Sequence, residues 1–296
     1  MHSEKQHDEG ITEIVHEERL TNELVPSAKF RFKNGEPLYE APEVPLQELF
    51  KPTTQKVLHA LETEPFVIAT GPSAIGKSEL FLEKSGLERL DAGGIIKRLK
   101  SSQNNYIVLN GQGGSGETVL GDIVAGNDID PYYEETYQKA KYVVVDETTA
   151  IMMRTDMNFL PAFPKMVEDG KKLILVGGGK ASTEQQMEMI AGYLQDAGLE
   201  TKQEQMIPIP PYLLTNQQVI EILNVRAGKE LSEEVTQFIV QKVDDAKLPK
   251  VFRLAHFLPL PIRHRSDQYF IEKFGTGVND ISWYRYQAHV GHIMGI

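Results

Sequence analysis

The clearest pattern in the chain is a series of short, uninterrupted apolar runs, separated by segments with the apolar spacing of helices. Four such runs are Phe66–Thr70, Tyr106–Asn110, Tyr142–Asp146 and Leu173–Gly177, and Glu204–Ile209 is a weaker fifth. Strands that are apolar throughout are typical of a parallel sheet covered by helices on both faces. The pattern therefore predicts an α/β fold.

The pattern changes after Pro210, where three segments have helical spacing. They run over Thr215–Gly228, Leu231–Asp245 and Leu248–Leu258. The first begins with a Thr or Asn cap and ends near a glycine. The second carries acidic residues in its first turn, where the helix dipole favours them. A small all-helical unit is therefore expected behind the sheet.

The residues ahead of the first strand predict an extended lead-in and one helix. Asn34-Gly35 is a turn signal in a stretch with three prolines. Helical spacing follows, with Pro52 near the start of the helix or at a break in it. The predicted organisation has five parts: a polar and mobile tail over 1–24, the lead-in and first helix over 25–62, an α/β core over 63–211, a helical lid over 212–258, and an aromatic and basic extension over 259–296.

Composition restricts the classes of function. The 296 residues carry a net charge of −11, so bulk attraction to nucleic acid or anionic lipid is not expected. The sequence has no cysteine, which excludes disulfides, thiolate catalysis and cysteine metal sites. No apolar run approaches the length of a membrane span, and the N-terminal residues lack the apolar core of a signal peptide. A cytoplasmic protein with no membrane partner is the simplest expectation.

The most specific motif is a phosphate-binding loop of the pattern G-x-x-x-x-G-K-[ST], placed between the first clear strand and a helical segment. Such a loop needs glycine where backbone N–H groups converge on a phosphate, and the next helix directs its positive end at the same phosphate. Lys77 is expected to reach the β- and γ-phosphates, and Ser78 to ligate Mg²⁺. The predicted nucleotide-binding residues are Gly71, Pro72, Ser73, Ala74, Ile75, Gly76, Lys77, Ser78 and Glu79.

Two adjacent acids supply the second half of the predicted site. Asp146 ends an apolar strand, where its carboxylate can meet a magnesium ion beside Ser78. Glu147 follows immediately and is well placed to polarise an attacking water as a general base. Nothing in the chain resembles the Asn-Lys-x-Asp guanine reader of GTPases. ATP with Mg²⁺ is therefore the expected ligand.

The order of these features resembles that of the AAA+ ATPases and of their signalling relatives, the STAND NTPases. The shared order is a phosphate loop, a strand with Asn110 at its end, a strand that ends in Asp146-Glu147, a further strand and then a helical lid. The lid is most similar to that of origin-recognition-type and STAND members, and the resemblance covers roughly Val44 to Leu258. It implies a P-loop NTPase parallel sheet with flanking helices followed by a helical lid, and ATP hydrolysis that drives a conformational change on a macromolecular partner.

The resemblance assigns roles to individual residues. Lys77 and Ser78 match the Walker A lysine and hydroxyl. Asp146 and Glu147 match the Walker B metal ligand and catalytic glutamate. The resemblance therefore implies that Ser78 and Asp146 hold the metal and that Lys77 and Glu147 act on the phosphates and on water.

Three further positions are implied by the resemblance, and each has a structural alternative. Asn110 lies where such ATPases often keep a polar residue that holds the glutamate inactive, although a strand-end turn explains it equally simply. Arg253 resembles the lid arginine that contacts the γ-phosphate; the alternative is a solvated arginine on an amphipathic helix. Pro249 resembles the lid proline near the adenine; the alternative is ordinary helix-start chemistry.

The chain departs from the family pattern in two places. Its fourth strand ends in glycines, where relatives usually carry an Asn, Thr or Ser sensor, and Lys180 and Ser182 are the polar residues that follow. No arginine finger is identifiable, Arg154 being the nearest candidate. These departures weaken the expectation of fast, oligomer-dependent hydrolysis more than the expectation of nucleotide binding.

Two other functions stay open. One is a nucleotide or small-molecule kinase, in which Asp91 and Arg98 would shape the acceptor site. The other is a non-catalytic interaction module that is locked by bound nucleotide. The expected partners are ATP and ADP, together with a protein partner or self-association; nucleic acid is not indicated by the net charge.

Overall fold

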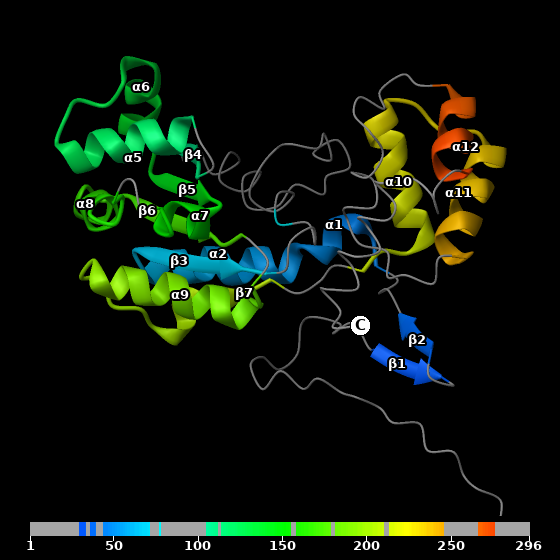
Figure 1. Ribbon diagram of the computed structural model, residues 1–296, viewed down its shortest axis with the longest axis horizontal. Coiled ribbons are helices and arrows are strands. Elements are labelled where there is room, and N and C mark those ends of the chain that lie inside the picture. The colour runs from blue at the N-terminus through cyan, green and yellow to red at the C-terminus, as the bar shows by residue number, and fades with distance from the viewer. Residues whose placement is uncertain are drawn as a thin grey trace, which may run out of the picture.

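The computed structural model describes residues 30–33, 36–39, 44–71, 77, 105–111, 114–154, 158–178, 181–209, 213–245 and 266–275, and every structural statement below concerns these residues. Their main element is one parallel sheet with helices on both faces, accompanied by a separate group of helices (Figure 1). This confirms the fold class predicted from the apolar runs.

The sheet has five strands in the order β4-β5-β6-β3-β7, and every described strand pair in it is parallel. Strand β3, which lies between β6 and β7, is buried at all five positions, which explains why its sequence is apolar almost throughout. All five predicted strands are confirmed, with small differences at the ends of the last two. The bounds are Phe66–Thr70 for β3, Tyr106–Asn110 for β4, Tyr142–Asp146 for β5, Lys172–Val176 for β6 and Met206–Pro208 for β7.

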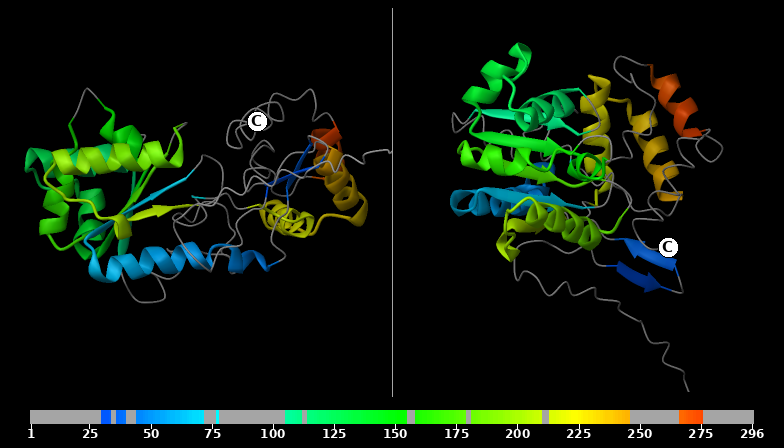
Figure 2. Two further views of the ribbon diagram at one scale, coloured as in Figure 1. Left: turned by 90° about the horizontal axis from the view of Figure 1, so that it is seen from below. Right: turned by 60° about the vertical axis from the view of Figure 1, so that its left-hand side comes forward.

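Helices cover both faces of this sheet, as the two views of Figure 2 show. Alternate residues of β3 enter two separate apolar cores: Phe66 and Ile68 belong to one, and Val67 and Ala69 to the other. The helices that accompany the sheet are α1 (Leu46–Leu49), α2 (Lys51–Thr63), α5 (Ser115–Ala125), α6 (Pro131–Lys139), α7 (Thr148–Met152), α8 (Ala162–Glu168) and α9 (Thr183–Asp196), with a short 3-10 helix η2 (Gln203–Gln205).

The lead-in forms a hairpin and a broken helix. Strands β1 (Phe30–Lys33) and β2 (Glu36–Tyr39) pair antiparallel, with Asn34-Gly35 between them. The helical segment divides at Phe50, and Pro52 occupies the first turn of α2, where its missing N–H is tolerated. Pro52 therefore lies near the start of a helix, one of the two placements that the sequence left open.

The second unit consists of α10 (Asn216–Ala227), α11 (Glu233–Asp245) and α12 (Asp267–Gly275). Helix α10 begins with a capping box in which the Thr215 hydroxyl accepts from the N–H of Gln218, and it ends at Gly228 in the left-handed conformation. The first two predicted lid helices are confirmed; the third, over Leu248–Leu258, lies outside the described residues.

Helix α12 lies in the segment predicted as a C-terminal extension, and it packs against α11. Its start is capped by Ser266, whose hydroxyl accepts from the N–H of Tyr269 at 3.3 Å. Lys229 Nζ forms an ion pair of 2.5 Å with Asp267. The sequence analysis missed this helix because it is short and its stabilising contacts come from distant residues.

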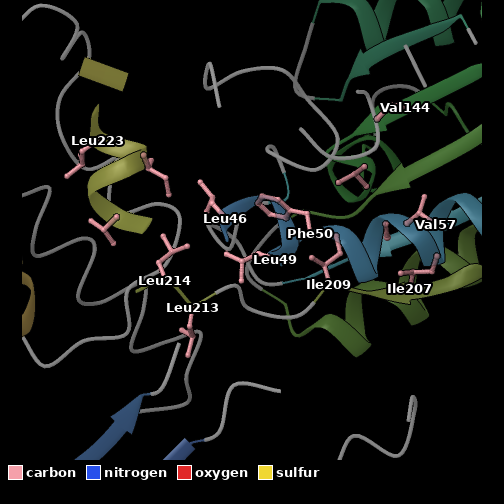
Figure 3. Packing of buried hydrophobic residues seen from close by; sticks show 14 of the residues in the cluster. Leu46, Leu49, Phe50, Val57, Val144, Ile207, Ile209, Leu213, Leu214 and Leu223 are labelled. Carbon is pink, nitrogen blue, oxygen red and sulfur yellow. The ribbon is translucent and has the colours of Figure 1, made fainter. Parts of the chain in front are cut away.

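An apolar cluster connects the helical unit to the sheet (Figure 3). Leu213 and Leu214, each 2% exposed, precede α10 and share this cluster with Leu46 and Phe50 of the lead-in. The Gln218 amide also donates to the carbonyl of Val44 at 2.6 Å. The start of α10 is therefore fastened to the segment that precedes the sheet.

Candidate functional site

Two of the predicted site residues, Asn110 and Asp146, lie at the side of the sheet where the parallel strands end. In the strand order β4-β5-β6-β3, the residues at these ends are Asn110, Asp146, Val176 and Thr70. Because parallel strands present all their carboxyl ends at the same edge, this is where ligands of open α/β sheets bind. The sequence-predicted strand ends are therefore brought together.

The phosphate loop begins at this edge, directly after β3. Gly71 is buried, and the Lys77 ammonium donates to its carbonyl at 2.6 Å. The contact brings the lysine side chain back over the start of its own loop. The other predicted loop residues, Pro72 to Gly76 together with Ser78 and Glu79, lie outside the described residues.

Asn110 and Asp146 are direct partners in the register of β4 and β5. The pairing continues one residue further, because the Gly111 N–H donates to the Asp146 carbonyl at 2.9 Å. The Asn110 N–H donates to the Ser115 hydroxyl at 3.2 Å, which fixes the start of α5 against the end of β4. Helix α5 therefore begins within the glycine-rich stretch Gly111–Gly116.

Glu147 has an unusual backbone conformation. Its φ of 55° and ψ of 40° lie in the left-handed region, and it is the one non-glycine residue with positive φ among those described. An L-residue in this conformation is destabilised by roughly 1–2 kcal/mol. The Glu147 N–H donates to Asp146 Oδ1 at 3.1 Å, and its carbonyl accepts from Ala150, so the strained residue links the strand end to α7.

The Glu147 carboxylate lies over Gly178, just past the end of β6. A Cβ atom at Gly178 would overlap Glu147 Oε2 and would lie 2.6 Å from Glu147 Cδ. A Cβ at Gly177 would instead overlap the Thr70 side chain. A Cβ at either position would therefore displace a neighbouring side chain.

Thr149 joins α7 to the same glycine. The Gly178 N–H donates to Thr149 Oγ1 at 3.2 Å, and the Thr149 hydroxyl donates back to the Gly178 carbonyl. Sequence reasoning did not single out Thr149 or Gly178 as a pair. The sequence shows only a hydroxyl two residues after Glu147 and a glycine run at a strand end. Neither feature alone indicates that the two residues are in contact.

The remaining candidates lie away from this edge or serve other roles. Arg154, the nearest candidate for an arginine finger, forms an ion pair with Glu117 of α5 and lies over the Phe159 ring. Ser182, considered as a substitute sensor, caps α9 by accepting from the Gln185 N–H. The other residues, Asp91, Arg98, Lys180, Pro249 and Arg253, lie outside the described residues.

A second concavity opens outside the edge strand. It is an open groove of about 570 Å³ between β4, the start of α5 and α6, and Asn110, Ser115, Tyr132 and Tyr133 are among the residues that line it. The Tyr132 ring is 83% exposed and meets Tyr133 edge to face at 4.8 Å between centroids.

Two searches of the structure limit other kinds of site. Among the described residues, no group of three or more His, Asp or Glu side chains is arranged to hold a metal ion. No helix among them has the length and apolar character needed to cross a membrane.

No protein-family model matches the chain, and no curated protein sequence matches it. The structure is similar to domain III of the replication initiation protein DnaA from Thermotoga maritima, with 14% identity, 81% of this chain and 92% of that chain covered, and a TM-score of 0.41. It is similar to the ORC1 protein of Aeropyrum pernix in complex with DNA, with 16% identity, coverage of 86% and 66%, and a TM-score of 0.44.

A Walker-type ATPase of Pyrococcus abyssi is also similar, with 11% identity, coverage of 83% and 79%, and a TM-score of 0.44. At these identities and TM-scores the likeness concerns the arrangement of strands and helices, and the functional argument below rests on the residues of this chain.

Proposed function

We propose that this protein binds Mg-ATP at the carboxyl edge of its sheet, hydrolyses it, and passes the change in nucleotide state to a macromolecular partner. One observation carries the proposal. Strand β3, which leads into the complete phosphate-loop motif with Lys77, and strand β5, which ends at Asp146 just before Glu147, present their carboxyl ends on the same side of one parallel sheet.

The residues at this edge fit the proposed ligands. The Lys77 ammonium lies at the start of the phosphate loop, where it can turn from the Gly71 carbonyl to a phosphate. Asp146 offers a half-buried carboxylate at the strand end, and oxygen ligands of this kind suit Mg²⁺. We assign ATP to the loop from Gly71 to Glu79, and Mg²⁺ to Ser78 and Asp146. The bound metal would neutralise charge on the phosphates.

The chain's own residues then divide the work. Lys77 holds the β- and γ-phosphates and offsets their negative charge. Glu147 accepts a proton from a water and orients it toward the phosphate. The positive φ of Glu147 directs its carboxylate away from β4 and over β6, which in the strand order is the neighbour of β3 and its loop.

A route from this edge to the helical unit supports the proposed coupling. Strand β7 pairs with β3, and the Ile209 N–H donates to the Thr70 carbonyl at 2.7 Å, next to Gly71. Leu213 and Leu214 follow shortly after and are buried before α10. A shift of the phosphate loop would therefore reach α10 along a short length of chain. A protein partner or a second copy of this chain suits the net charge of −11 better than nucleic acid does.

The test measures binding, assembly and turnover together. Native mass spectrometry of the protein with and without Mg-ATP reports bound nucleotide and oligomeric state, and phosphate release reports hydrolysis. ATP bound with release of phosphate to water supports the proposal. Nucleotide retained through purification with no turnover supports the interaction module instead, and no binding of any nucleotide overturns both.

A kinase is the second candidate, and the groove beside Asn110 favours it. Its volume of about 570 Å³ lies in the range of small-molecule sites, roughly 300–1,000 Å³. Asn110 both lines this groove and pairs with Asp146, so an acceptor in the groove would lie near the proposed metal ligand. Transfer of labelled phosphate from ATP to a small-molecule acceptor, with little release to water, would select this function.

A further inference from the structure

The Glu147 carboxylate occupies the space that a side chain at the end of β6 would fill. A Cβ at Gly178 would overlap Glu147 Oε2 and would lie 3.0 Å from Oε1. The backbone of Gly178 is outside the left-handed region, so an L-residue there would cause no backbone strain but would displace the Glu147 carboxylate from its position. The Glu147 carboxylate therefore packs directly against the backbone of Gly178.

Thr149 fixes the position of Gly178 relative to α7. Its side chain is 4% exposed and both donates to and accepts from the backbone of Gly178. The neighbouring Thr148 hydroxyl donates to the Val145 carbonyl at 2.8 Å and holds the other end of the junction. Glu147 is thus enclosed between two anchored points, one on β5 and one past β6.

The arrangement also leaves free the space between Glu147 and the end of β3, where the phosphate loop begins. Going from β5 along the sheet edge, β6 comes next and β3 follows. Gly177 is packed against the Thr70 side chain, and neither glycine projects a side chain into this space. The glycines at the end of β6 therefore do not simply leave the site without a polar sensor; they make room for Glu147.

We infer that Thr149 is a positioning residue for Glu147 and that Gly178 is required to hold the Glu147 carboxylate over β6. The structural part of this inference stands on the contacts alone. Its kinetic part rests on the proposed function, because it concerns the rate at which Glu147 activates water. A group displaced by about 1 Å from its productive position can lose roughly 100-fold in rate.

The structural part is tested by a thermal-unfolding cycle of Gly178→Ala, Glu147→Ala and the double variant. Gly178→Ala should lower the melting temperature by roughly 1–3 °C when Glu147 is present, because the added Cβ displaces the Glu147 carboxylate. The loss should be at least halved in the Glu147→Ala background, where the overlapping carboxylate is gone. Gly192→Ala in α9 is the matched control, since a Cβ there meets nothing within 4 Å. Additive losses would overturn the inference.

The kinetic part is tested with Thr149→Val, which removes the hydroxyl and keeps the shape, and with Thr149→Ser, which keeps the hydroxyl. Thr149→Val should lower kcat about 10- to 100-fold, with ATP affinity within about two-fold of the parent. Thr149→Ser should retain most of the rate. In a Glu147→Gln background Thr149→Val should cause no further loss of rate.

An unchanged kcat in Thr149→Val, or an equal loss in Thr149→Ser, would remove Thr149 from its positioning role. If the parent protein neither binds nor hydrolyses ATP, the proposed function fails. The unfolding cycle then still decides whether Gly178 and Glu147 are coupled, so the two failures are distinguishable.

Discussion

Asn110 and Asp146 lie opposite each other in the parallel register of β4 and β5, side by side at the sheet edge. The Glu147 carboxylate lies over Gly178, on the other side of β5. The arrangement associates Asn110 with the proposed metal ligand more closely than with the proposed base. It bears directly on the role that family resemblance gives to Asn110.

The first prediction concerns Asn110→Ala. If Asn110 supports Asp146, the variant should need about two- to five-fold more Mg²⁺ for half-maximal ATP binding, the effect of one lost neutral hydrogen bond. Its basal rate should stay at or below that of the parent. Magnesium titrations of ATP binding and of phosphate release measure the two effects. A basal rate several-fold above the parent would instead show that Asn110 restrains Glu147.

Lys77→Ala tests the phosphate loop. Loss of a charge-assisted contact is on the order of 1.5–3 kcal/mol, so ATP affinity should fall roughly 10- to 100-fold. The fold should stay intact because Lys77 is only half-buried and donates to the Gly71 carbonyl at the start of its own loop. Calorimetric titration with Mg-ATP and circular dichroism check both expectations. Equal affinity in parent and variant would rule out the loop as the phosphate site.

The sequence was sufficient for the sheet and for the strand-end residues. Runs such as Phe66–Thr70 are apolar because helices bury both faces, and Asp146 is recognisable because a charged residue ends such a run. These signals are local. They suffice to predict a shared site because all parallel strands of a sheet end on the same side of it.

What the sequence could not predict depends on distant contacts. The tie between Thr149 and Gly178 spans 29 positions, and the left-handed backbone of Glu147 has no signature in a sequence. The glycines at the end of β6 could be read only as a missing sensor, because their close neighbours come from β5 and β3. Ser115 likewise looked like part of a loop until its contact with Asn110 placed it at a helix start.

A third prediction concerns stability at high pH. The Tyr137 hydroxyl is buried and has no hydrogen-bond partner among the described residues. Burial, followed by the nearby Asp169 charge, raises the pKa of Tyr137 to about 12 from 10.0. The folded state thus keeps the proton while the unfolded state loses it. The contribution of Tyr137 is fully present below pH 10 and is lost as pH rises toward 12, by on the order of 2–3 kcal/mol.

Tyr137→Phe isolates this effect. The variant keeps the ring beneath the Lys171 ammonium, which lies 4.7 Å from its centroid, and removes only the unpaired hydroxyl. At pH 7 it should be as stable as the parent or slightly more stable. Denaturant unfolding between pH 8 and roughly pH 11 should show a smaller loss in the variant. Parallel losses in both proteins would show that Tyr137 does not titrate differently on unfolding.

Asp146→Asn separates metal binding from phosphate binding. The amide keeps the size of the side chain and loses the charge that we assign to Mg²⁺. ATP affinity in the presence of Mg²⁺ should fall toward the affinity measured without metal, whereas the metal-free affinity should change little. Calorimetry with and without Mg²⁺ measures both. An unchanged gain from Mg²⁺ would place the metal away from Asp146.

Glu147→Gln separates binding from chemistry. The Glu147 carboxylate lies over Gly178, while Asp146 occupies the strand end, so removal of the Glu147 charge should leave Mg-ATP binding intact. Loss of the general base should reduce the hydrolysis rate by about 10²–10⁴. The variant should therefore retain ATP, and any ATP-dependent assembly should persist longer in native mass spectra. The melting temperature of Glu147→Gln serves as the control for folding, because Gln has the same cost as Glu in the left-handed backbone at this position. If Glu147→Gln hydrolyses ATP as fast as the parent while Asp146→Asn does not bind the metal, the base is another group, and the close packing of Glu147 on Gly178 is structural.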